Sequence, residues 1–245
     1  DIEYGEMYRL ALSIHLRKKP EVKRAPHQAK ILISDIETSM IKFYGFSPYN
    51  KYVQADNLIE DWFLLTTSSK WLFSEETIDD KLTVDELDRY DDRRLAENMW
   101  KLLDEADIVV YYNGVKFDIP KLNAKFLEYG LGLPSPYKVI DPFITVKRMF
   151  GLTYRSLDQV CRVMGINRKL ENEKGLWQKV MKKDYEALNR MMSYNTNDSL
   201  ILEELYLGIR PYIRSHPNIG LHITEDVCSC PTCGSENIHF NVGSD

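Results

Sequence analysis

The chain has 245 residues, of which 32 are basic and 37 acidic, so its formal net charge is −5. This length is enough for one or two domains that close a hydrophobic core without disulfides or metal staples. A content of 44% hydrophobic and 28% charged residues is typical of a globular chain. The acidic balance excludes a protein that binds nucleic acid through bulk positive charge, but it permits an enzyme with a local basic groove and an acidic metal site.

Cysteine use and hydropathy predict a cytoplasmic protein. Three of the four cysteines crowd at Cys228, Cys230 and Cys233, which is not the even spread of a secreted disulfide framework. No run approaches the roughly 18 apolar residues that span a bilayer, and the first thirty residues lack the apolar core of a signal peptide. We therefore expect no membrane contact. Because the chain begins at Asp1, we also expect that residues upstream of it are missing.

The pattern along the chain predicts three segments: a helix and basic linker over residues 1–27, a main domain over 28–215 and a tail over 216–245. In the main domain, β-branched and aromatic runs indicate strands over residues 31–38, 40–46, 62–72, 108–112 and 139–141. Helical spacing of apolar residues indicates helices over residues 95–103, 118–129, 142–150, 156–164 and 184–209.

The order of these elements predicts the fold class. Residues 77–94 are so acidic that we expect a solvated connection there. Strands come first, as a possible antiparallel meander, and strands alternating with helices follow. This order favours an α/β fold with a mixed sheet and helices packed on it.

Three acidic motifs lie where such a fold presents side chains. Asp35 and Glu37 are two residues apart at the end of a strand, so both project from one face. Asp118 follows the next buried strand, where it could equally be a helix cap before Ile-Pro. Tyr194 and Asp198 are one helical turn apart, although a buried Tyr beside an exposed Asp gives the same pattern.

Taken together, the motifs D-x-E, N-x-x-x-F-D and Y-x-x-x-D resemble those of the DEDDy branch of the RNase H-like 3′-5′ exonucleases. The resemblance spans residues 28–215. Within this family, the chain resembles phage and bacterial proteins in which a zinc ribbon follows this domain, and more distantly the proofreading domain of family B DNA polymerases. The sister branch has a catalytic His five residues before the last Asp, where this chain has Ser193. The resemblance implies an RNase H-like α/β fold whose mixed sheet joins an antiparallel meander to parallel strands, in a bacterial or phage-infected host cytoplasm.

The resemblance also implies roles for the five motif residues. Asp35 would bridge two divalent ions, Glu37 and Asp198 would bind the first, and Asp118 would hold the second mainly through water. Tyr194 would orient the attacking water. Clustered carboxylates repel one another unless cations neutralise them, and all-oxygen ligands suit Mg²⁺ or Mn²⁺. Two such ions permit phosphodiester hydrolysis without a covalent nucleophile.

The substrate expected from this resemblance is the 3′ end of single-stranded DNA, with RNA as an alternative, and a replication or repair partner could deliver it. Asn113 would hydrogen-bond the strand, and Phe117 would pack on a base unless it is core. Lys121, like Lys116, could meet a phosphate. A basic groove with a stacking tyrosine is a further option, equally explained by a solvated face; it comprises Tyr154, Arg155, Arg162, Arg168 and Lys169.

The tail contains the knuckle Cys230-Pro-Thr-Cys233-Gly, which is half of a zinc ribbon site. Cys228, His222 or His239 could complete an unusual zinc site, and a metal-free tail is the alternative. Cys161 lies on an apolar helical face and is expected in the core. Asp141 has no metal role in the resemblance, so we expect it to cap a helix or support the site.

The sequence therefore predicts a metal-dependent 3′-5′ exonuclease that releases nucleoside 5′-monophosphates. One rival is a structure-specific endonuclease that uses the same metal site and cuts internally. A second rival is a non-catalytic nucleic-acid-binding subunit, against which the five intact motif residues count.

Overall fold

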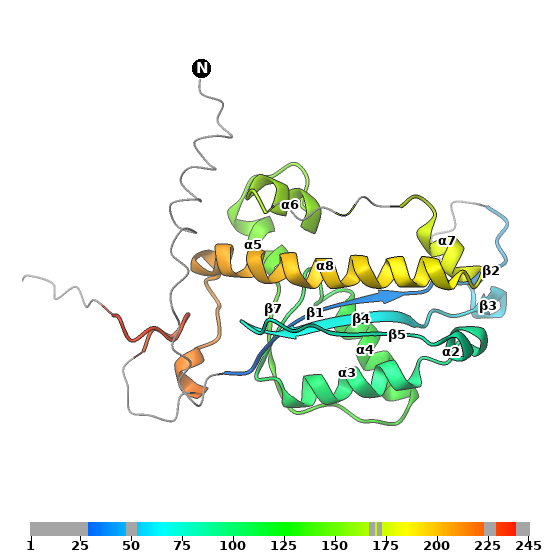
Figure 1. Cartoon of the computed structure of the whole chain (residues 1–245), viewed down its shortest axis with the longest axis horizontal. Coiled ribbons are helices and arrows are strands. Elements are labelled where there is room, and N and C mark those ends of the chain that lie inside the picture. Colours follow the sequence, from blue (N-terminus) through cyan, green and yellow to red (C-terminus); the bar gives the residue numbers. More distant parts are fainter. Residues whose placement is uncertain (1–28, 48–52, 167–169, 171–172, 223–228, 239–245) are drawn as a thin grey trace, which may run out of the picture.

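The computed structural model describes residues 29–47, 53–166, 170, 173–222 and 229–238. The helix and linker expected over residues 1–27 lie outside the described residues. A five-stranded sheet forms the middle layer, with the long helix α8 on one face and α3 and α4 on the other (Figure 1). The mixed α/β class expected from the sequence is confirmed.

The sheet places strand β1 at its centre. Its order is β5 (Ile78–Lys81), β4 (Leu64–Trp71), β1 (Ile31–Thr38), β6 (Ile108–Val110) and β7 (Lys138–Ile140). The β1–β4 and β4–β5 pairs are antiparallel, whereas β1–β6 and β6–β7 are parallel. The two parallel neighbours and β1 end at the same edge of the sheet, and this edge presents the acidic motifs.

Two strand expectations are corrected by this topology. Of residues 40–46, only β2 (Lys42–Phe43) is a strand, and it pairs with β3 (Leu58–Glu60) in a separate two-stranded sheet. The third antiparallel strand of the main sheet is instead β5, inside the segment expected to be a solvated connection. Its sequence IDDK lacks apolar alternation because an edge strand leaves much of its surface in water.

The helices agree with the expected positions to within a few residues. They are α2 (Val84–Arg89), α3 (Arg93–Glu105), α4 (Asp118–Glu128), α5 (Pro142–Met149), α6 (Leu157–Val163), α7 (Leu176–Met181) and α8 (Tyr185–Ile209), with 3-10 turns at Ala55–Asn57, Arg210–Tyr212 and Ile219–His222. The sequence analysis missed α2 and α7, which have only six residues each. A capping box between Thr83 and Glu86 starts α2 and is visible in the sequence as T-V-D-E.

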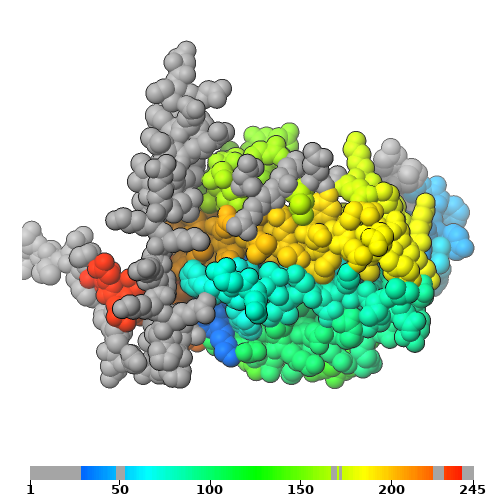
Figure 2. Space-filling model, viewed as in Figure 1, coloured from blue at the N-terminus to red at the C-terminus, as the bar shows by residue number. Residues whose placement is uncertain are grey.

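Side chains of β1 alternate between two hydrophobic clusters. Leu32 and Ile36 pack toward α3 and α4, and Ile33 packs with residues of α8 such as Leu202. Asp35 and Glu37 share the parity of Ile33, so they point to the side of the sheet that α8 covers. In the space-filling view, the side chains of α8 (yellow) lie against the cyan and teal segment that contains β4 and β5 (Figure 2).

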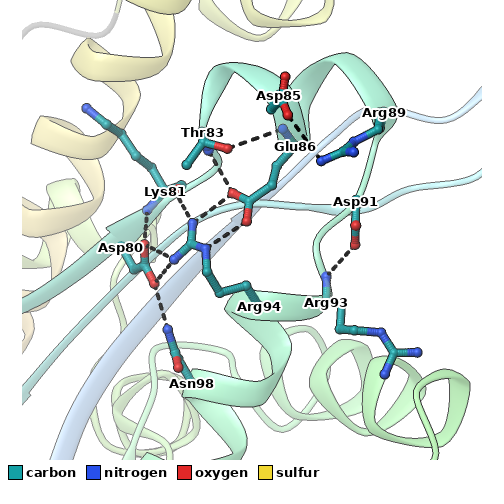
Figure 3. A network of polar contacts seen from close by, with 10 residues as sticks. All are labelled: Asp80, Lys81, Thr83, Asp85, Glu86, Arg89, Asp91, Arg93, Arg94 and Asn98. Carbon is teal, nitrogen blue, oxygen red and sulfur yellow. Dashed lines mark hydrogen bonds and ion pairs between the residues drawn. The ribbon is translucent and has the colours of Figure 1, made fainter.

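One guanidinium joins the three elements that follow β4. Arg94 of α3 donates to Asp80 of β5 at 2.6 and 2.7 Å and to both carboxylate oxygens of Glu86 in α2 at 2.7 and 2.8 Å (Figure 3). It also donates to the backbone carbonyl of Lys81 at 2.8 Å. These hydrogen bonds from Arg94 lower the pKa of Glu86 to about 2. The network therefore holds a segment whose sequence has little apolar surface.

We predict that Arg94→Ala lowers the free energy of unfolding by about 2 to 3 kcal/mol, because it leaves the partly buried carboxylates of Asp80 and Glu86 without their hydrogen-bond donor. The matched control is Arg89→Ala, which removes one exposed pair with Asp85 and should cost less than about 0.5 kcal/mol. Urea denaturation of both variants measures the difference. Equal effects of the two substitutions would contradict the structural role of Arg94.

Candidate active site

Strand β1 and helix α8 bring three carboxylates together. Asp35, Glu37 and Asp198 each offer an oxygen atom, and these three atoms lie within 4.8 Å of one another. In the described part of the chain, they form the only group of three or more acidic, His or Cys side chains with this spacing. Residues separated by more than 160 positions thus meet at one point of the sheet.

Asp118 joins this group from the opposite face of the sheet. It is the first residue of α4 and only 2% exposed, and Phe117 occupies the cap position, so the helix-cap interpretation of Asp118 is wrong. Its Oδ1 accepts a hydrogen bond of 3.3 Å from the backbone N–H of Ile36, between Asp35 and Glu37. Its negative charge raises the pKa of both neighbours on β1. The four motif acids are therefore one electrostatic unit.

Burial favours protonation of all four acids, and repulsion by the other acids of the cluster adds to this effect for Asp35 and Glu37. Burial raises the pKa of Glu37 to about 8, helped by the charges of Asp198 and Asp118. Burial also raises the pKa of Asp118 to about 7 and that of Asp198 to about 6, the latter with a contribution from Asp158. The pKa of Asp35 is raised by burial and by all three other acids.

None of the ion pairs among the described residues includes one of these four acids. The cluster is thus a concentration of negative charge without a basic partner in that part of the protein. Oxygen donors at this spacing fit a hard divalent cation, which would replace the missing positive charge.

Asn195 contacts Asp35 and was missed by the sequence analysis. Its Nδ2 donates to Asp35 Oδ2 at 2.6 Å, and its Oδ1 accepts from Thr66 Oγ1 at 3.0 Å. A signal existed in the sequence: Asn195 lies one turn from Met191 and Ser199 on the buried side of α8, where a polar residue needs a partner.

Tyr194 is positioned by the segment before α7. Its Oη accepts a hydrogen bond of 3.1 Å from the backbone N–H of Glu173. Glu173 is itself held by ion pairs to Lys179 and Arg190, the latter at 2.6 Å. The phenol is therefore fixed in place from one side, while its own proton stays available for donation.

Asp141 fixes the turn between β6 and α4. Its carboxylate accepts from the backbone N–H of Asn113 at 2.9 Å, of Val115 at 3.3 Å and of Phe143 at 3.0 Å. The expected helix cap is confirmed, because Asp141 is the N-cap of α5 and accepts the hydrogen bond from the Phe143 N–H in its first turn. Asn113 adopts a left-handed conformation with φ of 62°. The side chain of Asp141 thus supports a strained turn that carries Asp118.

The expected substrate contacts form an aromatic group at the start of α4. Phe117 is 40% exposed, so the core interpretation of this residue is wrong. Lys121 Nζ lies 3.7 Å from the ring centroid of Trp62 and 5.1 Å from that of Phe117. The sequence analysis missed Trp62, which it had assigned only to a strand. Lys116 is exposed beside this group.

The candidates for a basic groove lie in and around α6 in the sequence. Tyr154 is exposed, Arg162 is paired with Asp158 at 3.2 Å, and Arg168 and Lys169 lie outside the described residues. Arg155 is half-buried, and its backbone carbonyl accepts from Tyr112 at 2.5 Å. Because only two of the four basic residues are among the described residues, the basic groove stays a prediction.

The described part of the tail contains the free thiols of Cys230 and Cys233. Burial opposes ionisation of the Cys230 thiol, but backbone N–H groups of Thr232 and Cys233 lower its pKa overall. His222 pairs with Asp107 at 3.3 Å, while Cys228 and His239 lie outside the described residues. The expected zinc site therefore stays a prediction. Cys161 is buried in the cluster beneath α8, as expected.

Residues 67–209 match the model of the RNase_H superfamily, which is more than half of the chain. The chain belongs to this superfamily. The matched span of this RNase H superfamily member contains Asp118, Tyr194 and Asp198. Asp35 and Glu37 precede the span in the sequence, but strand β1 places them beside Asp198.

Among solved structures, the chain is similar to the family B DNA polymerase of the hyperthermophilic archaeon Pyrobaculum calidifontis, with 17% identity and a TM-score of 0.51. The similarity covers 76% of this chain and 25% of the polymerase. No curated protein matches this RNase H superfamily chain. No helix of the described part is long and apolar enough to cross a membrane.

We predict that the metal-free protein loses stability as the pH rises from about 5 to 8. Each of the four acids has a raised pKa in the folded state, so folding favours the protonated form, and this contribution disappears as pH passes the folded pKa values. The loss should reach about 2 kcal/mol or more in EDTA. Asp198→Asn should flatten the profile, and Mn²⁺ should do the same for the unmodified chain. If the unmodified chain and Asp198→Asn lost stability with pH to the same extent in EDTA, repulsion among the four acids would be contradicted.

We also predict that Gly114→Ala destabilises the turn that carries Asp118. A Cβ at this position would lie 2.1 Å from Tyr111 Cβ. The clash should cost about 2 to 3 kcal/mol or more. Gly151→Ala is the matched control, because a Cβ there meets nothing within 4 Å, and its effect should stay within about 0.5 kcal/mol. Thermal unfolding measures both, and an unchanged Gly114→Ala variant would refute the close packing.

Proposed function

We propose that this protein is a metal-dependent 3′-5′ exonuclease that hydrolyses the terminal phosphodiester bond of single-stranded DNA and releases nucleoside 5′-monophosphates. The observation that carries the proposal is the cluster of one buried acid, Asp118, and three half-buried ones, without a basic partner among the described residues. The superfamily membership supports a nuclease, and the similarity to a DNA polymerase supports DNA as substrate and a replication or repair setting.

Asp35, Glu37 and Asp198 would hold one Mg²⁺ or Mn²⁺ ion, and Asp35 with Asp118 would hold a second. Bound divalent ions would activate water and stabilise the negative charge that develops on the phosphoryl group. The protein contributes the fixed positions of the four carboxylates, which come from the strand and the two helices described above. Partial burial keeps bulk water from screening these charges.

Tyr194 would act on the attacking water. Since its Oη already accepts a bond from Glu173, the rotation of its O–H group is restricted and its proton can be directed toward a water or a phosphate oxygen. Phe117 and Trp62 offer ring faces for unpaired bases, and Lys121 between them supplies a positive charge. Asn113 would contact the strand from the same turn. Zinc at Cys230 and Cys233 belongs to the proposal as a separate site in the tail.

The test is digestion of 5′-labelled linear single-stranded DNA and RNA, beside a closed DNA circle, in Mn²⁺ and in EDTA. We expect a ladder of shortened linear DNA in Mn²⁺, an intact circle and no cleavage in EDTA. Asp198→Asn should lower the rate by on the order of 10³-fold, because it removes a charged metal ligand. Glu186→Gln, an exposed acid on the same helix, is the matched control and should leave the rate unchanged.

Cutting of the circle would instead identify an endonuclease with the same metal site. Binding of DNA without any cleavage in Mg²⁺ or Mn²⁺ would contradict the proposal and favour a non-catalytic subunit. A preference for RNA would change the substrate and leave the mechanism intact.

A further inference from the structure

We infer that Thr66 and Asn195 form a hydrogen-bond relay that positions the Asp35 carboxylate for divalent metal binding. This inference rests on the proposed function and adds two positioning residues to it. The relay comprises Thr66 Oγ1–H to Asn195 Oδ1 and Asn195 Nδ2–H to Asp35 Oδ2, at 3.0 and 2.6 Å.

Three different elements supply the relay. Thr66 belongs to β4, Asn195 to α8 and Asp35 to β1. Thr66 is paired directly opposite Glu37 in the β1–β4 register, so its hydroxyl is on the same face as the two acids of β1. Both Thr66 and Asn195 are completely buried, which leaves their polar atoms dependent on each other.

The carboxylate of Asp35 and the hydroxyl of Thr66 together fix how the amide of Asn195 is oriented, because an ionised carboxylate only accepts and the hydroxyl is then left to donate. An amide can present either its oxygen or its nitrogen to a partner. A donor at Oδ1 requires the oxygen to face β4, and this turns the NH₂ group toward Asp35. The Asp35 carboxylate accepts from this NH₂ group through Oδ2, so its other oxygen, Oδ1, is left for a cation.

The neutral charge of the donor distinguishes this arrangement from an ordinary buried ion pair. A Lys or Arg at this position would fix the carboxylate equally well but would repel a divalent cation. An amide fixes the carboxylate and leaves the negative charge of the cluster intact. Among the hydrogen bonds of the described residues, the one from Asn195 is the one that reaches the Asp35 side chain. The arrangement corresponds to partners that orient metal ligands in other proteins.

A neighbouring hydrogen bond provides a matched control. Ser199 is also completely buried on α8, one turn after Asn195, and its Oγ donates to the backbone carbonyl of Ser68 in β4 at 3.0 Å. It therefore joins the same helix to the same strand without touching Asp35. Ser199→Ala tests what loss of such a bond does by itself.

The experiment measures Mn²⁺ affinity of the full chain by isothermal titration calorimetry, with no nucleic acid present. We expect Asn195→Ala and Thr66→Val to weaken Mn²⁺ binding by about 10- to 100-fold. Thr66→Ser keeps the hydroxyl and should restore affinity to within about 3-fold of the unmodified chain, and so should Ser199→Ala. In nuclease assays, Thr66→Val should need more Mn²⁺ for half-maximal rate while kcat at saturating Mn²⁺ changes less.

The outcomes separate this inference from the proposed function. If the unmodified chain binds no Mn²⁺, the proposed function fails together with the relay. If it binds Mn²⁺ and both relay variants bind equally well, the relay alone is wrong. An equal loss in Ser199→Ala would show a general packing effect and would also overturn the relay. If circular dichroism shows that Asn195→Ala is unfolded, the Thr66→Val and Thr66→Ser pair decides the question.

Discussion

Repulsion among four carboxylates that are largely withdrawn from water is the constraint on which this structure depends. Three of the acids have pKa values raised to about 6, 7 and 8, and the fourth, Asp35, is shifted in the same direction. The protein opposes this repulsion with neutral contacts: backbone pairing of β1 on both sides, the amide of Ile36 on Asp118 and the amide of Asn195 on Asp35. Such contacts hold the acids together without cancelling their charge, so the cluster keeps its attraction for a cation.

All four acids lie on regular secondary structure. Asp35 and Glu37 are on the central strand, and Asp198 is in the middle of a 25-residue helix packed across β1 and β4. Asp118 follows a turn whose backbone N–H groups at Asn113 and Val115 donate hydrogen bonds to the carboxylate of Asp141. The positive φ of Asn113 and the close approach of Gly114 to Tyr111 show how tightly this turn is built. Rigid supports of this kind preorganise a site, which is the main protein contribution when metal ions supply the chemistry.

The sequence predicted the sheet class and most long elements because their apolar periodicity is strong. It also predicted that Asp35, Glu37, Asp118 and Asp198 act together, because their motifs in this order resemble those of the DEDDy exonucleases; strand parity and helix spacing alone place only the residues within each motif. It did not predict β5, whose IDDK sequence is held by the Arg94 network rather than by burial of apolar side chains. Nor did it predict Asn195, Thr66 or Trp62, because their roles come from contacts between residues up to 160 positions apart. Pairings of that kind depend on register and on helix placement, which no local pattern specifies.

Metal binding by the four acids is tested most directly by a crystal structure of the protein grown with Mn²⁺ and a nucleoside 5′-monophosphate, with anomalous scattering used to locate manganese. We expect one manganese peak among Asp35, Glu37 and Asp198 and a second beside Asp35 and Asp118, with the phosphate of the nucleotide in contact with both. Anomalous peaks elsewhere, or none at the four acids in crystals soaked to saturation, would show that the cluster is not a metal site.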